Sequence, residues 1–206
     1  GFPTEAQKGY KHVEKKLFAA AWEIIKRNNI SMRDVLAIGV SCGGPLDSRK
    51  GLIMSPPNLP GWDNIPFAEI LTEEFKVPAY IQNDANACAL VEWKLGAGRG
   101  TDNMIFLTMG TGFGAGIISE GVLLRGTNDM AGEVGHIRLE DDGPVGFGKA
   151  GSIEGFCSGG GIAALSRSIT QQMIDEGKTP AWIKDGIGME EISAKIIAEY
   201  ANNGDE

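Results

Sequence analysis

The chain has 206 residues, of which 42% are hydrophobic and 22% are charged, and its formal net charge is −8. This is the composition of a globular protein with one substantial core or two small lobes, and the negative charge argues against DNA or an anionic membrane surface as the main partner. No apolar stretch approaches the ~20 residues of a membrane span, and nothing resembles a secretory signal, so we expect a cytoplasmic protein.

The first predicted element is an amphipathic helix over residues 10–28, because apolar residues recur on one face and lysines on the other. Its apolar face comprises Val13, Leu17, Phe18, Ala21, Ile24 and Ile25. A buried strand is predicted over residues 35–40. Two loops follow it, Gly43-Gly44-Pro45-Leu46-Asp47 and Pro57-Asn58-Leu59-Pro60-Gly61-Trp62.

A short buried strand over residues 78–82 leads directly into Asn83 and Asp84, and an alanine-rich helix is predicted over residues 85–95. The carboxyl ends of parallel strands are where an α/β sheet presents chemistry to a ligand. Asp and Asn are also preferred helix N-caps. The pattern therefore predicts that Asp84 is an N-cap, a catalytic base, or both.

Residues 104–109 predict another buried strand, followed by a glycine-rich turn over residues 110–116 and a return strand over 117–119. A simple hairpin is one interpretation. Glycines at four alternate positions also let backbone N–H groups approach phosphate oxygens, with the Thr111 hydroxyl as a further donor. The turn is not a Walker loop, since it lacks the Gly-Lys-Ser/Thr ending and leads into a strand.

Three polar segments follow: Glu133-Val134-Gly135-His136, Gly151-Ser152-Ile153-Glu154 and Ser158-Gly159-Gly160-Gly161. The last precedes an apolar helix start at residues 162–165. It is either a flexible hinge or an anion-binding helix N-terminus. An acidic helix is predicted over residues 189–200.

In this order and at these spacings, the motifs between Val35 and about Arg167 resemble the ROK family of sugar kinases and sugar-responsive repressors, and most closely its bacterial glucokinases. The resemblance implies an α/β protein with the actin-like ATPase (ribonuclease H-like) fold, in which two lobes surround a cleft. Residues 1–100 would form most of the smaller lobe and residues 101–206 part of the larger. It further implies ATP, Mg²⁺ and a sugar as ligands, and a homodimer.

The resemblance also implies a role for each motif. Asp84 is expected to be the general base, facing the cleft from the first lobe. The expected sugar ligands are Gly44, Asn58, Asn83, Glu133, His136 and Glu154. The expected nucleotide-binding residues are Gly110, Thr111, Gly112, Gly114, Ser158, Gly159 and Gly160.

The chemistry of the residues agrees with this assignment. A carboxylate that takes the proton of a sugar hydroxyl accelerates transfer by roughly 10²–10⁴-fold. A ring of donors and acceptors rejects an analogue that lacks a hydroxyl, because the site's own polar groups are then left unpaired.

One motif departs from the family pattern. Many members bind zinc through the Glu-x-Gly-His histidine and three cysteines in a Cys-x-Cys-Gly-x-x-Gly-Cys-x-Glu run, and here the matching residues are Val145, Phe147 and Ser152. A structural zinc site needs about four nitrogen or sulfur ligands. The cysteines, Cys42, Cys88 and Cys157, have no metal spacing and indicate reduced thiols. We expect no metal site, with Val145 and Phe147 packing the loop by apolar contact and His136 free for the sugar.

The family pattern begins with a strand and an Asp-x-Gly-Gly-Thr phosphate turn, which residues 1–7 do not contain, and continues beyond the acidic helix to an adenosine-binding part. We therefore expect a fragment that is catalytically silent on its own. Three functions stay open. The first is an ATP-dependent kinase for glucose, with an N-acetylhexosamine or fructose as other candidates. The second is the sugar-sensing module of a repressor, although repressors usually keep the zinc site. The third is a degenerate fragment that binds sugar weakly.

Overall fold

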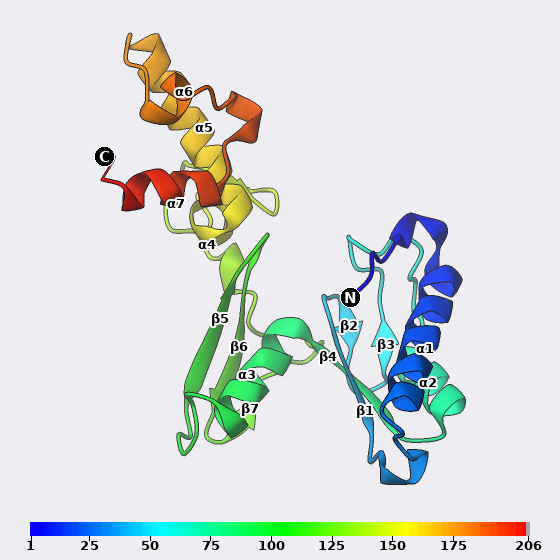
Figure 1. Cartoon of the computed structure of the whole chain (residues 1–206). Coiled ribbons are helices and arrows are strands. Elements are labelled where there is room, and N and C mark those ends of the chain that lie inside the picture. The colour runs from blue at the N-terminus through cyan, green and yellow to red at the C-terminus, as the bar shows by residue number, and fades with distance from the viewer. Residues whose placement is uncertain (205–206) are drawn as a thin grey trace. The chain divides into compact units, whose positions relative to one another are not determined.

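The computed structural model describes residues 1–204 and divides into two compact units (Figure 1). The first unit contains residues 1–104 and 117–131, and the second contains residues 105–116 and those from 132 onward. The division passes through both strands of a hairpin, at residues 104–105 and 116–117, and residues 117–131 return to the first unit. The expected lobe limits of 1–100 and 101–206 stay a prediction.

The first unit is built on a parallel pair of strands, β1 (Ile38–Cys42) and β4 (Ala79–Asn83). The sequence predicts the first strand three residues too early. Residues 32–34 form a short 3-10 helix, and pairing starts where the Ile38 N–H donates to the Pro78 carbonyl at 2.8 Å. In register, Cys42 lies opposite Asn83, so the two strands end together.

The other elements within residues 1–103 are helices around that pair and a small hairpin. They are η1 (Ala6–Lys8), α1 (Tyr10–Arg27), η2 (Met32–Asp34), β2 (Leu46–Asp47), β3 (Leu52–Ile53), α2 (Phe67–Phe75) and α3 (Asp84–Leu95). The predicted helices over residues 10–28 and 85–95 are confirmed as α1 and α3, with boundaries that differ by one residue.

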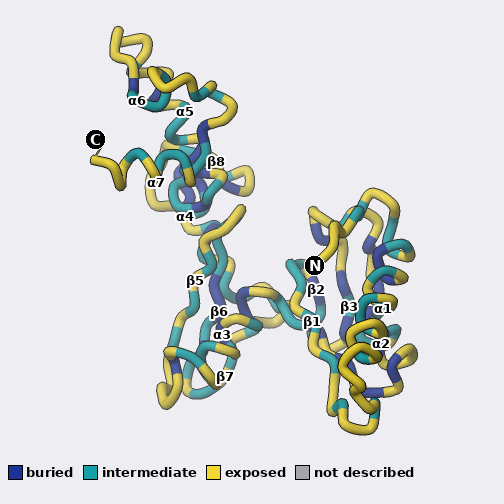
Figure 2. The backbone as a smooth tube through the Cα atoms, in the orientation of Figure 1, coloured by how far each residue is buried: buried dark blue, intermediate teal, exposed yellow. Residues whose placement is uncertain are grey.

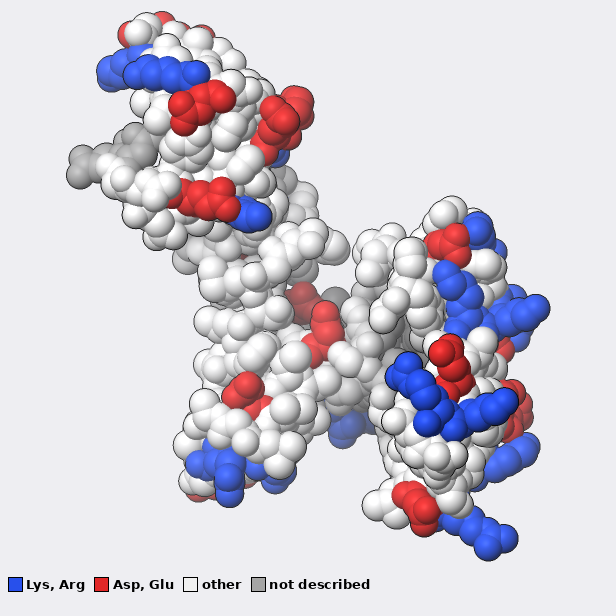
Figure 3. Space-filling view, in the orientation of Figure 1, with Lys and Arg blue, Asp and Glu red and all other residues white. Residues whose placement is uncertain are grey.

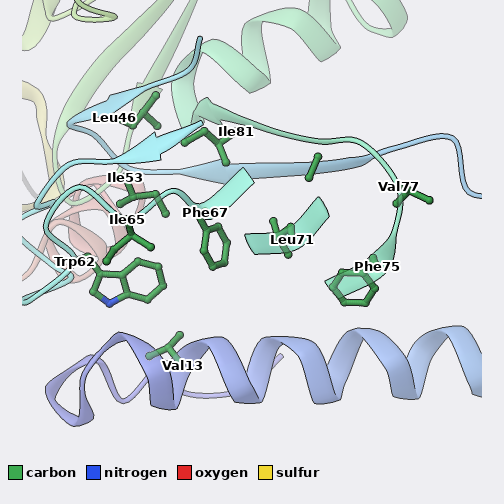
Figure 4. Close-up of a cluster of buried hydrophobic side chains, with 11 residues drawn as sticks. Val13, Leu46, Ile53, Trp62, Ile65, Phe67, Leu71, Phe75, Val77 and Ile81 are labelled. Carbon is green, nitrogen blue, oxygen red and sulfur yellow. The ribbon is translucent and has the colours of Figure 1, made fainter. Parts of the chain in front are cut away.

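The core of the first unit lies between α1, α2 and the strand pair (Figure 4). Val13 of α1, Phe67 of α2 and Ile81 of β4 are each at most 3% exposed. The apolar face predicted for α1 is confirmed at Phe18, Ala21 and Ile25, which pack on this core, but Leu17 and Ile24 are exposed. This packing holds the end of β4, and with it Asn83, against a rigid layer.

A three-stranded sheet has the order β5 (Met104–Met109), β6 (Phe113–Ser119) and β7 (Val122–Leu123). Strand β6 begins four residues earlier than predicted, because the Gly110 N–H donates to the Gly112 carbonyl at 3.0 Å and the turn closes within residues 110–112. Gly114 and Gly116 therefore belong to the strand. Buried positions run along β6 (Figure 2), with Ala115 and Ile118 at most 3% exposed.

The rest of the second unit is mainly helical. Its elements are η3 (Val134–His136), β8 (Val145–Gly146), β9 (Lys149–Ala150), α4 (Ile153–Cys157), α5 (Gly159–Asp175), α6 (Ala181–Lys184), η4 (Met189–Glu191) and α7 (Ala194–Asn202). The prediction of one helix over residues 189–200 is wrong for residues 189–193, because η4 ends at Glu191 and α7 begins only at Ala194. Ile192 is buried there, and the hydroxyl of Ser193 caps α7 by accepting the Ile196 N–H at 3.4 Å.

Acidic and basic side chains are interspersed over the visible face of the first unit (Figure 3). Within residues 1–204, none of the helices has the length and hydropathy of a membrane-spanning segment.

Candidate active site

The turn from β4 into α3 holds Asn83 and Asp84 in different roles. Asn83 is the N-cap, since its Oδ1 accepts the Asn86 N–H at 3.2 Å. Asp84 is the first residue of the helix, so the prediction that it is the cap is wrong. Because capping occupies the Asn83 oxygen, its NH₂ group is left to donate to a ligand.

The Asp84 carboxylate is exposed and has one oxygen in use. Its Oδ1 accepts the neighbouring Ala85 N–H at 2.9 Å. No hydrogen bond among residues 1–204 uses Oδ2. An ionised carboxylate has about four lone-pair sites, so Asp84 can accept a proton from a bound hydroxyl while staying anchored to the helix.

The end of β1 adds a thiol that the sequence analysis did not assign. Burial raises the pKa of the Cys42 thiol, and the nearby Asp84 carboxylate raises it further. The rule that parallel strands end at one edge could have found Cys42.

Gly44 lies just beyond β1, and a Cβ built there would come within 3.8 Å of Asn83 Nδ2. The structure thus brings Gly44 and Asn83 together. Asn58 lies in an exposed turn, and no hydrogen bond within residues 1–204 joins it to Asn83 or Asp84.

In the second unit, η3 brings the side chains of Glu133 and His136 close together, with Glu133 Oε2 3.9 Å from His136 Nε2. Their side chains are 48% and 34% exposed. The ring of Phe147 stacks on His136, with centroids 4.6 Å apart and an interplanar angle of 12°. Phe147 is 71% exposed and Val145 is 61% exposed, so the expectation that both residues pack this loop is wrong. Phe147 instead covers one face of the His136 imidazole, which was expected to be free for the sugar.

The loop that resembles the zinc-binding run is held by other contacts. Ser152 is fully buried, and its hydroxyl caps α4 by accepting the Gly155 N–H at 3.1 Å. Lys149 Nζ donates to the His136 carbonyl at 2.8 Å. Within the described part of the chain no group of three or more His, Cys, Asp or Glu residues could hold a metal ion. A capping hydroxyl, a phenyl ring and an exposed valine supply no nitrogen or thiolate, so these residues do not fit a structural zinc.

We therefore predict that the protein binds no structural zinc. Elemental analysis of protein purified without added metal should show far less than one zinc per chain, because His136 alone cannot supply a closed site. A stoichiometric zinc that survives dialysis against a chelator would mean that other residues form the site.

The glycine turn between β5 and β6 is fixed at both ends. The Gly159 N–H donates to the Gly110 carbonyl at 2.8 Å, and the Phe113 N–H donates to Glu154 Oε2 at 3.0 Å. Thr111 is exposed, and no hydrogen bond within residues 1–204 uses its N–H or that of Gly112. These donors, with the Thr111 hydroxyl, fit a phosphate group.

The segment Ser158-Gly159-Gly160-Gly161 is the start of α5, so the hinge interpretation is wrong. Ser158 is the buried N-cap, and its Oγ accepts the Gly161 N–H at 2.9 Å. A Cβ at Gly161 would overlap the Gly155 carbonyl oxygen, which explains the glycine there. The Gly160 N–H has no partner among the hydrogen bonds of residues 1–204. It is therefore available to an anion at the helix N-terminus.

The sequence resembles both kinases and regulators of known function. It is 37% identical over 166 residues to a glucokinase from Halalkalibacterium halodurans, covering 80% of this chain and 50% of that protein. It is also 32% identical over 190 residues to a xylose repressor from Caldicellulosiruptor bescii, covering 91% of this chain and 46% of that protein. The chain thus spans about half the length of these relatives.

A similar solved structure is a ROK family glucokinase from Streptomyces griseus in complex with glucose and AMPPNP, with a TM-score of 0.68 and 30% identity. That comparison covers 93% of this chain and 61% of the crystallised one. ROK sugar kinases have the actin-like ATPase fold, and the mixed α/β structure described above is part of that fold, as the sequence predicts. A model of the ROK family matches residues 4–206, and the chain therefore belongs to the ROK family.

Proposed function

We propose that the protein is an ATP-dependent sugar kinase that transfers the γ-phosphoryl group of ATP to a hydroxyl of a hexose, with glucose as the leading substrate. The observation that carries the proposal is the state of Asp84. Its carboxylate stands exposed at the carboxyl end of β4 with one oxygen uncommitted, while Asn83 takes over the capping of α3. Because Asn83 already caps α3, capping does not account for the carboxylate at Asp84.

In this proposal Asp84 accepts the proton of the attacking hydroxyl, and the Asn83 amide donates to a neighbouring sugar oxygen. Glu133 and Glu154 accept hydrogen bonds from other hydroxyls, as does His136. Asn58 and the backbone at Gly44 are proposed as further sugar contacts.

The phosphates of ATP are proposed to bind two sets of backbone donors in the second unit. The first is the turn at Gly110, Thr111 and Gly112, which continues to Gly114 at the start of β6. The second is the N-terminus of α5, where Ser158 holds Gly159 and Gly160 in the first turn. Mg²⁺ bound with ATP would neutralise charge on the β- and γ-phosphates.

The second candidate function is a sugar sensor within a repressor, favoured by the similarity to the xylose repressor over 91% of this chain. A sensor needs the sugar ligands but not turnover. The loop at Val145, Phe147 and Ser152, which differs from the zinc-binding pattern, supports the kinase over the sensor. A homodimer remains our expectation from the family resemblance, and a cytoplasmic location remains our expectation from the sequence.

A coupled assay of ADP release with Mg-ATP and a panel of sugars tests the proposal on the full-length protein, since the 206-residue chain alone is expected to be catalytically silent. We expect turnover with glucose and less with fructose or an N-acetylhexosamine. Xylose is the matched control, because it carries the ring hydroxyls of glucose but lacks the hydroxymethyl group. Turnover of glucose but not xylose, with xylose still binding in calorimetry, would place the acceptor on that group. Sugar binding in calorimetry without ADP release from any sugar would favour the sensor.

A further inference from the structure

The carboxylate of Glu154 is bonded to the glycine turn, 41 residues away in sequence. Its Oε2 accepts the N–H of Phe113, the first residue of β6, at 3.0 Å. Gly112 lies against the same oxygen, since a Cβ built there would be only 2.9 Å from Oε2. The sugar-ligand role proposed for Glu154 does not account for this contact.

The same short segment also holds the other end of the turn. The Glu154 carbonyl accepts the Ser158 N–H at 3.0 Å, which connects α4 to the start of α5, and the Gly159 N–H then donates to the Gly110 carbonyl at 2.8 Å. The side chain of Glu154 thus holds the end of the turn, while the backbone five residues later holds its beginning. The N–H groups of Thr111 and Gly112 lie between these two attachments.

Glu154 itself is rigidly placed. It is the second residue of α4, which Ser152 caps, and a Cβ at Gly155 would overlap the Pro144 carbonyl oxygen. The backbone of α4 therefore lies in close contact with the residue that precedes β8. No hydrogen bond within residues 1–204 uses Oε1 of Glu154, so one oxygen holds the turn and the other is left for a ligand.

We infer that Glu154 is a positioning residue for the phosphate-binding turn, and that through its two oxygens it couples occupancy of the sugar site to nucleotide binding. The inference rests on the proposed function, in which the turn at residues 110–112 binds phosphate. A sugar hydroxyl that donates to Oε1 restricts the carboxylate that orients the Phe113 N–H. Each ligand therefore raises the affinity for the other by the same factor.

Calorimetry with Mg-AMPPNP in the absence of sugar tests the positioning role on the full-length protein. Glu154→Ala should weaken AMPPNP binding roughly tenfold, because the Phe113 N–H loses a charged acceptor. Glu154→Gln should recover affinity to within about threefold of wild type, because the amide oxygen can still accept that N–H. Glu190→Ala is the matched control. Glu190 is an exposed glutamate of η4, outside the proposed site, so the AMPPNP affinity of this variant should equal that of wild type.

Gly112→Ala tests the same contact without replacing Glu154, because the added Cβ would lie 2.9 Å from Oε2 of Glu154. Its methyl group would displace the carboxylate, so it should also weaken AMPPNP binding, and this variant decides the question if Glu154→Ala does not fold. Repeating the titrations with saturating glucose should raise AMPPNP affinity in wild type but not in Glu154→Ala.

If folded Glu154→Ala binds AMPPNP as tightly as wild type does, the inference is overturned and the proposed function is not. A wild-type protein that binds no AMPPNP would overturn the proposed function and this inference with it.

Discussion

In the full-length protein, replacing Asp84 by Asn should lower kcat by roughly 10²–10⁴-fold while changing sugar affinity little. The amide keeps the size of the side chain, and its oxygen can still accept the Ala85 N–H that anchors Asp84 at 2.9 Å. It cannot take a proton from the attacking hydroxyl. The loss should therefore fall on turnover, measured by ADP release at saturating glucose, and not on glucose binding measured by calorimetry.

Asp34→Asn is the matched control for this experiment. Asp34 is an exposed aspartate at the end of η2, outside the proposed site, so the variant should turn over like wild type. A near-normal kcat in Asp84→Asn would contradict the assignment of Asp84 as the general base. A large loss of glucose affinity with unchanged kcat would instead make Asp84 a ligand for the sugar.

The sequence predicted well those features that depend on local pattern. The periodicity of α1, the strand over residues 104–109 and the polar groups at the end of β4 all follow from residues close together in the chain. The match of the ROK family model confirms the resemblance that the motif order indicated.

Features that depend on local backbone geometry, or on contacts between segments that no sequence pattern connects, were missed. The choice of Asn83 over Asp84 as the cap depends on which side-chain oxygen reaches Asn86, a matter of backbone geometry at ψ 144°. The bond from Phe113 to Glu154 joins residues that no sequence period connects. Phe147 could be expected to pack, but its partner, His136, could be identified only from the fold of the loop.

The strand that carries Asn83 shows a burial pattern that composition alone leaves ambiguous. In β4, Ala79 and Ile81 are at most 9% exposed, whereas Tyr80 between them is 64% exposed. A strand buried on both faces would hide Tyr80, so β4 is buried on one face only. Alternation with period two places Ile81 in the core with Phe67 and Leu71 (Figure 4).

Ile81→Ala should therefore lower the free energy of unfolding by about 2–5 kcal/mol, because it removes buried methyl groups and leaves a cavity that a packed core fills only partly. Tyr80→Ala is the matched control on the adjacent residue, and it should cost less than about 1 kcal/mol, since exposed strand positions are sensitive mainly to propensity. Urea unfolding followed by tryptophan fluorescence reports this loss, because Trp62 is buried in the same core. Equal losses in the two variants would mean that β4 does not pair in the register that places Asn83 opposite Cys42, and the geometry assigned to Asp84 would lose its support.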